Sequence, residues 1–222
     1  KLKEYRWKAI LSLGIKKENL RWKKHDNLVF YAKEAYDIEY NFPWGFDEME
    51  GIHARGNYDL TQHSKGSGQE LVYQDEITNE KFIPHIIESS GGVERLFLAF
   101  LCDAYTEDSM GGETRVYLKL KPSIAPIKAA VFPLLKNKPE LVNKAKEVFT
   151  MLNEEIQPIV FDDNGNIGKR YRRQDEIGTP FCIVIDFDTL TDDAVTVRDR
   201  DTGEQERIKI INLVKYIREK IN

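Results

Sequence analysis

The hydrophobic positions in the second half of the chain change between strand-like and helix-like spacing. A short apolar run at 127–135, interrupted late by Pro133, predicts a buried strand. Pro139 then opens a segment predicted to be helical. Its apolar residues recur on one helical face, and they are Leu141, Val142, Ala145, Val148, Phe149 and Leu152. Further short strands are predicted at 159–161 and 181–187.

The end of the chain has the pattern of a hairpin followed by a helix. Residues 195–198 and 207–210 flank the turn signal Asp201-Thr202-Gly203 and are predicted to pair. A polar stretch at 168–176 is predicted to be helical, and a closing helix is predicted from Leu213. Strands alternating with helices predict a mixed α/β sheet with helices on its faces.

The first half is less regular. Residues 28–35 are predicted to form a helix, 46–56 a strand, and 72–78 and 82–88 strands of an antiparallel sheet. A stronger helix follows, with a full amphipathic stripe at Val93, Leu96, Phe97, Phe100, Leu101 and Ala104.

Composition excludes several classes of protein. The chain has 222 residues with 33 basic and 37 acidic side chains, so its net charge of −4 gives no global nucleic-acid signature. Its most apolar stretch is far shorter than the ~20 residues of a membrane span. Two cysteines cannot form a disulfide framework and indicate a reducing compartment. Four scattered histidines argue against a structural zinc site.

Arg95 lies in the opening turn of the predicted helix, where a cation opposes the helix dipole by about 0.3–1 kcal/mol. One interpretation is a solvated surface arginine. The other is a phosphate site, because the segment 89–92, Ser-Ser-Gly-Gly, precedes the helix and could present backbone N–H groups to the same anion.

Glu48 and Glu50 are two residues apart in the predicted strand 46–56 and are therefore expected on one face. Two carboxylates on one face suit a cationic group or a magnesium ion. The alternative is an exposed strand edge whose charges prevent aggregation.

The run 168–173 carries four cations around an aromatic ring, and these cations are Lys169, Arg170, Arg172 and Arg173. This run is the best local RNA footprint in the chain, with phosphate contact expected rather than base readout. The alternative is a solvated helix face whose cations pair with Asp175 and Glu176.

Several short sequence motifs of this chain occur together in one known family. They are Pro43-Trp44-Gly45, Glu50-Gly51-Ile52, Tyr58-Asp59-Leu60, Ile87-Glu88-Ser89-Ser90, Gly92-Val93-Glu94-Arg95, Ala125-Pro126-Ile127-Lys128 and the long segment 163–182. With them the chain resembles the C-terminal part of a glycyl-tRNA synthetase of the dimeric class II type. The resemblance implies a partial class II antiparallel sheet with its motif 3 helix at 1–122, and a mixed-sheet α/β anticodon-binding domain at 125–222.

The resemblance also implies residue roles. Arg95 corresponds to the motif 3 arginine that contacts the γ-phosphate end of ATP. Glu88 and Ser90 correspond to residues that hold glycine, although Ser89 replaces the proline between them. Glu48 is implied as the partner of ATP-bound Mg²⁺ or of the glycine ammonium group. Glu50 is the alternative ATP-binding carboxylate. Arg55 is implied to help place the substrate.

The wider expectations follow from the same resemblance. The partners are glycine, ATP and glycine tRNA, acting in the cytoplasm as a homodimer in the intact protein, with no membrane and no DNA partner. Motif 1 is absent, and no arginine is followed two residues later by glutamate, as motif 2 requires. The chain alone is therefore expected not to form adenylate. The alternative is a non-catalytic RNA-binding accessory module on the same fold.

Overall fold

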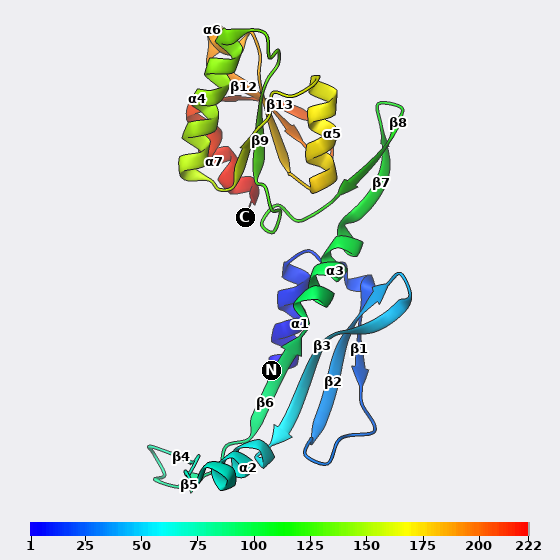
Figure 1. Ribbon diagram of the computed structural model, residues 1–222, viewed down its shortest axis with the longest axis vertical. Coiled ribbons are helices and arrows are strands. Elements are labelled where there is room, and N and C mark those ends of the chain that lie inside the picture. The colour runs from blue at the N-terminus through cyan, green and yellow to red at the C-terminus, as the bar shows by residue number, and fades with distance from the viewer. Residues whose placement is uncertain (222) are drawn as a thin grey trace. The chain divides into compact units, whose positions relative to one another are not determined.

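A computed structural model describes residues 1–221, which divide into two compact units. The first unit is Lys1–Asp103, and the second begins at Ala104. Figure 1 labels most of their helices and strands.

The first unit is built on an antiparallel sheet with strand order β1-β2-β3-β6. These strands are β1 Leu20–Lys24, β2 Glu34–Phe42, β3 Gly45–Gly56 and β6 Ile86–Gly91. Helix α1 (Leu2–Ser12), the 3₁₀ turn η1 (Lys17–Asn19) and helix α3 (Val93–Ala104) complete the framework. The predicted strand at 46–56 and the predicted helix from Val93 are confirmed.

One face of this sheet is apolar and the other is polar. Ile38, Tyr40 and Phe42 alternate along β2 and pack in one core with Ile10 of α1 and Ala99 of α3. Both helices therefore cover the same face. The intervening strand positions carry charged or polar side chains on the opposite face, among them Arg21, Asp37, Glu39 and His53.

A β-bulge at Met49 corrects the expected arrangement of Glu48 and Glu50. Glu48 pairs with Glu39, whereas Glu50 pairs with the adjacent residue Ile38. Neighbouring residues of a strand point to opposite faces. Glu48 therefore joins the polar face and Glu50 faces the helices, so the prediction that they share a face was wrong.

One prediction for the loops of this unit was also wrong, and another holds only in part. The segment 28–35 forms no helix: it is irregular up to β2, and Phe30 is exposed and packs edge-on against Tyr31 and Tyr58. The antiparallel strands predicted at 72–78 and 82–88 are present but shorter: the segment forms the pair β4 (Tyr73–Gln74) and β5 (Lys81–Phe82) and then the start of β6. Helix α2 (Tyr58–Ser67) precedes this pair.

The second unit contains the hairpin β7 (Tyr105–Met110) and β8 (Glu113–Leu118) and a mixed sheet of order β10-β9-β11-β12-β13. The sheet strands are β9 Ala129–Pro133, β10 Ile159–Phe161, β11 Phe181–Ile185, β12 Ala194–Asp199 and β13 Gln205–Lys209. Strands β9, β10 and β11 are parallel, and β12 and β13 pair antiparallel. The predicted mixed α/β architecture is confirmed.

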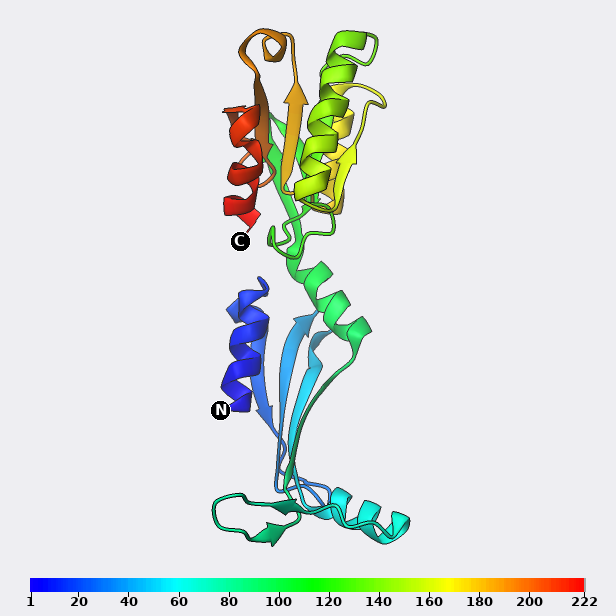
Figure 2. The same ribbon diagram turned by 90° about the vertical axis from the view of Figure 1, so that its left-hand side faces the viewer.

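Helices lie on both faces of this sheet (Figure 1), and Figure 2 shows one of these faces turned to the viewer. Helices α4 (Pro139–Glu155) and α7 (Ile210–Ile221) lie on one face, and α5 (Ile167–Ile177) lies on the other. A short helix, α6, spans Thr189–Asp192.

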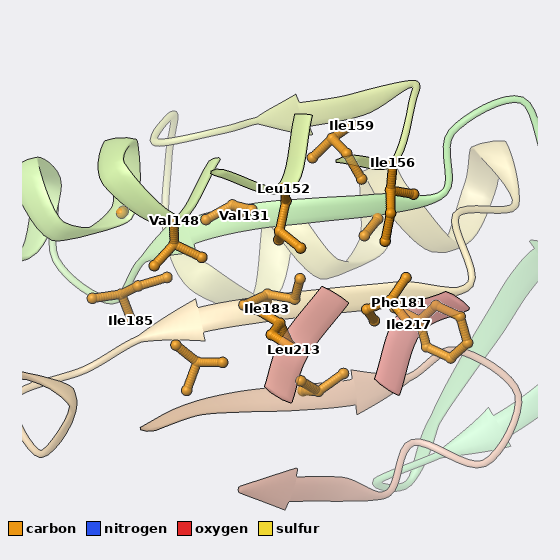
Figure 3. Close-up of a cluster of buried hydrophobic side chains, with 14 of the residues drawn as sticks. Val131, Val148, Leu152, Ile156, Ile159, Phe181, Ile183, Ile185, Leu213 and Ile217 are labelled. Carbon is orange, nitrogen blue, oxygen red and sulfur yellow. The ribbon is translucent and has the colours of Figure 1, made fainter. Parts of the chain in front are cut away.

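The central strand β11 is buried on both sides. Ile183 and Ile185 pack with Val131, Leu152 and Leu213 in the core beneath α4 and α7 (Figure 3). Cys182 and Val184 alternate to the α5 side. A continuous apolar run is typical of a strand covered on both faces.

The structural division falls at Asp103, and the β7–β8 hairpin groups with the second unit. The functional boundary expected at 122–125 remains a prediction. Within residues 1–221, no helix combines the length and apolarity needed to cross a bilayer.

Candidate functional site

The polar face of the first sheet brings together side chains from β3 and β6. His53 of β3 lies opposite Glu88 of β6, and His53 Nδ1 is 3.1 Å from Glu88 Oε1. Arg55 Nη1 donates to the same oxygen at 3.1 Å, and Arg55 Nε donates to Asp59 at 2.7 Å. The hydrogen bonds that Arg55 donates to the Asp59 and Glu88 carboxylates raise the pKa of Arg55. Arg55 therefore orients Glu88 while leaving about a third of that carboxylate side chain exposed.

Gly51 keeps this face open. A Cβ at Gly51 would lie 3.1 Å from His53 Nε2 and 3.5 Å from Glu48 Oε1. Ser90 is the strand partner of Gly51, so its side chain is directed to the same face. The space beside Gly51 is consequently small and bordered by polar groups.

Arg95 meets the strand that carries Glu48. Its Nη1 donates to the backbone carbonyl oxygen of Glu48 and lies 3.2 Å from Asp47 Oδ1. The hydrogen bond from Arg95 lowers the pKa of Asp47. About half of the Arg95 side chain remains exposed, so its guanidinium is accessible to an anion.

Glu50 has a different environment on the opposite face. Its carboxylate accepts two hydrogen bonds from Arg6 of α1, at 2.6 and 2.8 Å, and one from the hydroxyl of Ser89. Burial raises the pKa of Glu50, but the hydrogen bonds from Arg6 and Ser89 bring it below the usual value. Of the two candidates for an ATP-binding carboxylate, the geometry favours Glu48.

Sequence reasoning assigned no role to His53, Asp59 or Arg6. The two-residue spacing of His53 and Arg55 on a strand, and the four-residue spacing of Arg55 and Asp59, are signals that could have joined them to Glu88. The partnership of Arg6 with Glu50 spans 44 residues and has no local signal.

The basic run 168–173 lies on α5, as predicted. The Asn166 side chain caps this helix by accepting from the Lys169 backbone N–H at 2.9 Å. Lys169 and Arg172 are exposed. Arg173 is partly exposed and pairs with Asp162 at 2.6 Å.

Arg170 does not have the predicted role. Only 1% of it is exposed, and its guanidinium donates to the backbone carbonyls of Pro133, Asp163 and Gly165. The helical period turns this residue inward, where those carbonyls need donors. The prediction of an RNA phosphate contact for Arg170 was therefore wrong.

The alternative interpretation, a solvated helix face whose cations pair with Asp175 and Glu176, is wrong for Asp175. This carboxylate is buried and accepts from Arg115 of β8 and Arg198 of β12, rather than from the run on its own helix. Across residues 1–221, no group of three or more His, Cys, Asp or Glu side chains is arranged to hold a metal ion. The exposed carboxylate of Glu48 could hold a metal that also has ligands from a phosphate chain.

Comparison with known proteins identifies relatives of both units. Residues 128–220 match the family described as Anticodon binding domain. The chain is 52% identical over 222 residues to the glycine–tRNA ligase of Clostridium acetobutylicum, covering 99% of this chain and 47% of that protein. It is 51% identical over 217 residues to the ligase of Chlorobaculum tepidum, covering 98% and 46%. For Borrelia garinii subsp. bavariensis the identity is 50% over 217 residues, covering 96% and 48%.

The chain spans about half the length of the curated relatives it matches. Its similarity is nevertheless continuous across both structural units, since almost every residue of the chain lies within the matched region. These relatives are named as ligases, which gives no support to the alternative of a non-catalytic accessory module. Over the part that it spans, the chain belongs to the glycine–tRNA ligase family.

Proposed function

We propose that this chain acts as part of a glycine–tRNA ligase, which joins glycine to its tRNA through a glycyl adenylate formed from ATP. The observation that carries this proposal is the convergence of Glu88, Arg55 and His53 beside Gly51, on the polar sheet face of a chain from this family. The reaction takes place in the cytoplasm, where the whole protein acts as a homodimer.

The arrangement fits selection of glycine. The Glu88 carboxylate accepts charge-assisted hydrogen bonds from the substrate ammonium group, and Arg55 holds that carboxylate in place. Ser90 supplies a hydroxyl to the same face. Glycine has no side chain to bind, so larger amino acids are rejected by the limited space beside Gly51.

Under this proposal, Arg95 and Glu48 act at the ATP end of the site. The glycine carboxylate attacks the α-phosphorus in line, and pyrophosphate leaves. Arg95 exchanges its contact with Asp47 for the terminal phosphate and stabilises the negative charge of the leaving group. Glu48 would hold the Mg²⁺ ion that accompanies ATP, and this ion would supply positive charge to neutralise the phosphates. The tRNA 3′-terminal hydroxyl then attacks the adenylate.

The 222-residue chain by itself does not form adenylate under this proposal. It lacks the Arg-x-Glu motif that binds the α-phosphate. Helix α3 also exposes Val93 (76%) and Phe97 (64%), although its opposite face is packed on the sheet. A helix that is apolar on two faces is normally covered on both. The remainder of the whole protein covers the second face.

The second unit binds glycine tRNA. Lys169 and Arg172 are exposed on α5 within the matched anticodon-binding family. Most protein hydrogen bonds to nucleic acid go to the sugar-phosphate backbone, so these cations position the tRNA. The proposal includes no DNA and no membrane partner.

The proposal can be tested with a completed ligase. It is made by joining this chain to the part of the Clostridium acetobutylicum ligase that the chain does not match. The completed ligase should attach glycine to glycine tRNA, and the chain alone should show no glycine-dependent ATP–pyrophosphate exchange. Glu88→Gln should abolish most of the exchange, whereas the matched variant Glu70→Gln, at an exposed position, should retain it. A folded completed ligase that binds tRNA but charges no glycine would refute the proposed activity.

A further inference from the structure

A row of polar side chains crosses the first sheet and ends at the carboxylate proposed to bind glycine. Asp37 of β2 is 3% exposed, and its carboxylate lies 2.5 Å from Nε2 of His25, which follows β1. The other Asp37 oxygen lies 3.9 Å from His53 Nε2, and His53 Nδ1 lies 3.1 Å from Glu88 Oε1. The proposed function gives no role to His25 or Asp37, although both are joined to Glu88 through His53.

The ring of His53 is held in one orientation. An ionised carboxylate only accepts hydrogen bonds, so the contact with Glu88 places a proton on His53 Nδ1. The tip of the ring lies above Gly51: a Cβ at Gly51 would be 3.1 Å from Nε2 and 3.2 Å from Cε1. The ring of His25 meets it edge-on, with 6.5 Å between the ring centroids. His53 therefore occupies space that the missing side chain of Gly51 leaves free.

The same contacts leave one oxygen of Glu88 for the substrate. Within residues 1–221, His53 and Arg55 both contact Glu88 at Oε1, so Oε2 can accept from an ammonium group. Glu88 and Ser90 are the strand partners of His53 and Gly51. An amino acid held by Glu88 and Ser90 consequently lies alongside the tip of the His53 ring.

We propose that His53 sets the size limit for the amino acid, and that Asp37 and His25 are positioning residues that hold its ring over Gly51. The inference rests on the proposed glycine activation and assigns its selectivity to one side chain. Bound glycine presents only a Cα hydrogen to the ring, whereas a methyl group in the same place would overlap the ring tip. The buried charge of Asp37 attracts the Nε2 end of the ring, and His25 holds that carboxylate.

Two amide variants of the completed ligase separate the two ends of the ring. The His53→Asn side chain reaches the position of Nδ1, so it keeps a donor for Glu88 but removes the tip over Gly51. In ATP–pyrophosphate exchange, kcat/KM for alanine relative to glycine should rise about tenfold or more, with little change in the KM for glycine. His53→Gln places its amide near the position of Nε2 instead, so it should raise the KM for glycine and keep the selectivity.

His85→Asn is the matched control, because His85 is exposed and its ring contacts Lys33. An unchanged alanine-to-glycine ratio in His53→Asn, with normal exchange for glycine, would overturn the inference and leave the proposed activity intact. Loss of glycine exchange by folded His53→Asn would also overturn it, because loss of a size limit cannot explain that result. If the unmodified completed ligase activates no glycine, the proposed function and the inference both fail.

A second measurement tests the positioning residues without relying on activity. In the 222-residue chain with isotope-labelled histidine, nuclear magnetic resonance of the ring nitrogens should show the proton on His53 Nδ1. Asp37→Asn removes the charge beside Nε2 and should shift the ring signals of both His25 and His53. Asp188→Asn, at an exposed position of the second unit, should shift neither.

The same substitution links this structural effect to selectivity. In the completed ligase, Asp37→Asn should raise the alanine-to-glycine ratio several-fold, although less than His53→Asn does, because the ring is still present but less firmly held. Unchanged His53 signals in folded Asp37→Asn, or an unchanged ratio, would overturn the positioning role.

Discussion

Asp175 and Arg198 form a two-pronged ion pair, with nitrogen–oxygen distances of 2.9 and 3.0 Å and side chains only 3% and 7% exposed. The same carboxylate also accepts from Arg115, so one residue of α5 joins a strand of the sheet to the β7–β8 hairpin. This arrangement is structural, because none of the three groups is free to bind a ligand.

Asp175→Asn should therefore destabilise the chain by about 3–5 kcal/mol, since two buried guanidinium groups lose their counter-charge. Urea unfolding of the chain measures this change. The neighbouring variant Glu176→Gln, at an exposed position, should change the free energy of unfolding by less than about 0.5 kcal/mol. Equal effects of the two variants would contradict the role of the network.

Arg170→Met should lower stability by about 3 kcal/mol, because several buried carbonyls lose a charged donor at once. Arg172→Ala should leave stability nearly unchanged and weaken tRNA binding instead. Thermal unfolding and tRNA binding, measured on both variants, separate the two roles. Weaker binding by folded Arg170→Met, with no loss of stability, would restore Arg170 as an RNA contact.

The Glu50–Arg6 pair predicts a pH-dependent contribution to stability. The folded-state pKa of Glu50 lies below its unfolded value, which is about 4.3 for glutamate. The contribution is complete above that unfolded pKa and is lost as the pH falls through the lower, folded pKa.

Glu50→Gln should thus destabilise the chain by about 2 kcal/mol at pH 7, and the difference from the unmodified chain should shrink below about pH 4.3. Glu4→Gln, at an exposed position of α1, is the matched control and should show little difference at either pH. Free energies of unfolding across pH 3–7 provide the measurement. A difference that is constant over this range would argue against the ion pair.

Gly51→Ala places a methyl group 3.1 Å from His53 Nε2, in the space assigned to the substrate. In the completed ligase the variant should raise the KM for glycine about tenfold in ATP–pyrophosphate exchange, with little effect on the KM for ATP. Gly66→Ala is the control because its added Cβ meets nothing within 4 Å. An unchanged KM for glycine in Gly51→Ala would move the substrate site away from this residue.

The sequence predicted those elements whose side-chain spacing reports burial directly. The apolar run of β11 is the clearest example, because its side chains pack in cores on both sides of the sheet. Along α3, Leu96 and Phe100 of the predicted stripe pack in the core, whereas Val93 and Phe97 are exposed. At 28–35 the same logic failed: Phe30 is apolar but packs against exposed rings rather than in a core. Spacing alone cannot distinguish these two environments.

The site was less predictable than the fold for two physical reasons. The bulge at Met49 changes which face each carboxylate occupies, and a period of two cannot register an inserted residue. Arg170 and Arg172 lie two positions apart in one basic run, yet only the structure shows that the first is buried against carbonyl oxygens. The residue roles implied by family resemblance remain predictions.

Ser89 has a consequence for how defects in this protein would be recognised. It lies between Glu88 and Ser90, and its hydroxyl is bonded on the reverse of the sheet to the carboxylate that Arg6 holds. Adjacent residues of a strand share one backbone. If Ser89 loses its contact on one face, Glu88 and Ser90 therefore shift on the other. Helix α1 thus supports the geometry of the substrate space beside Gly51, although none of its side chains lines that space. Loss of Arg6 would be measured as poor affinity for glycine. Mutagenesis restricted to the residues that line the substrate space would not reveal this cause.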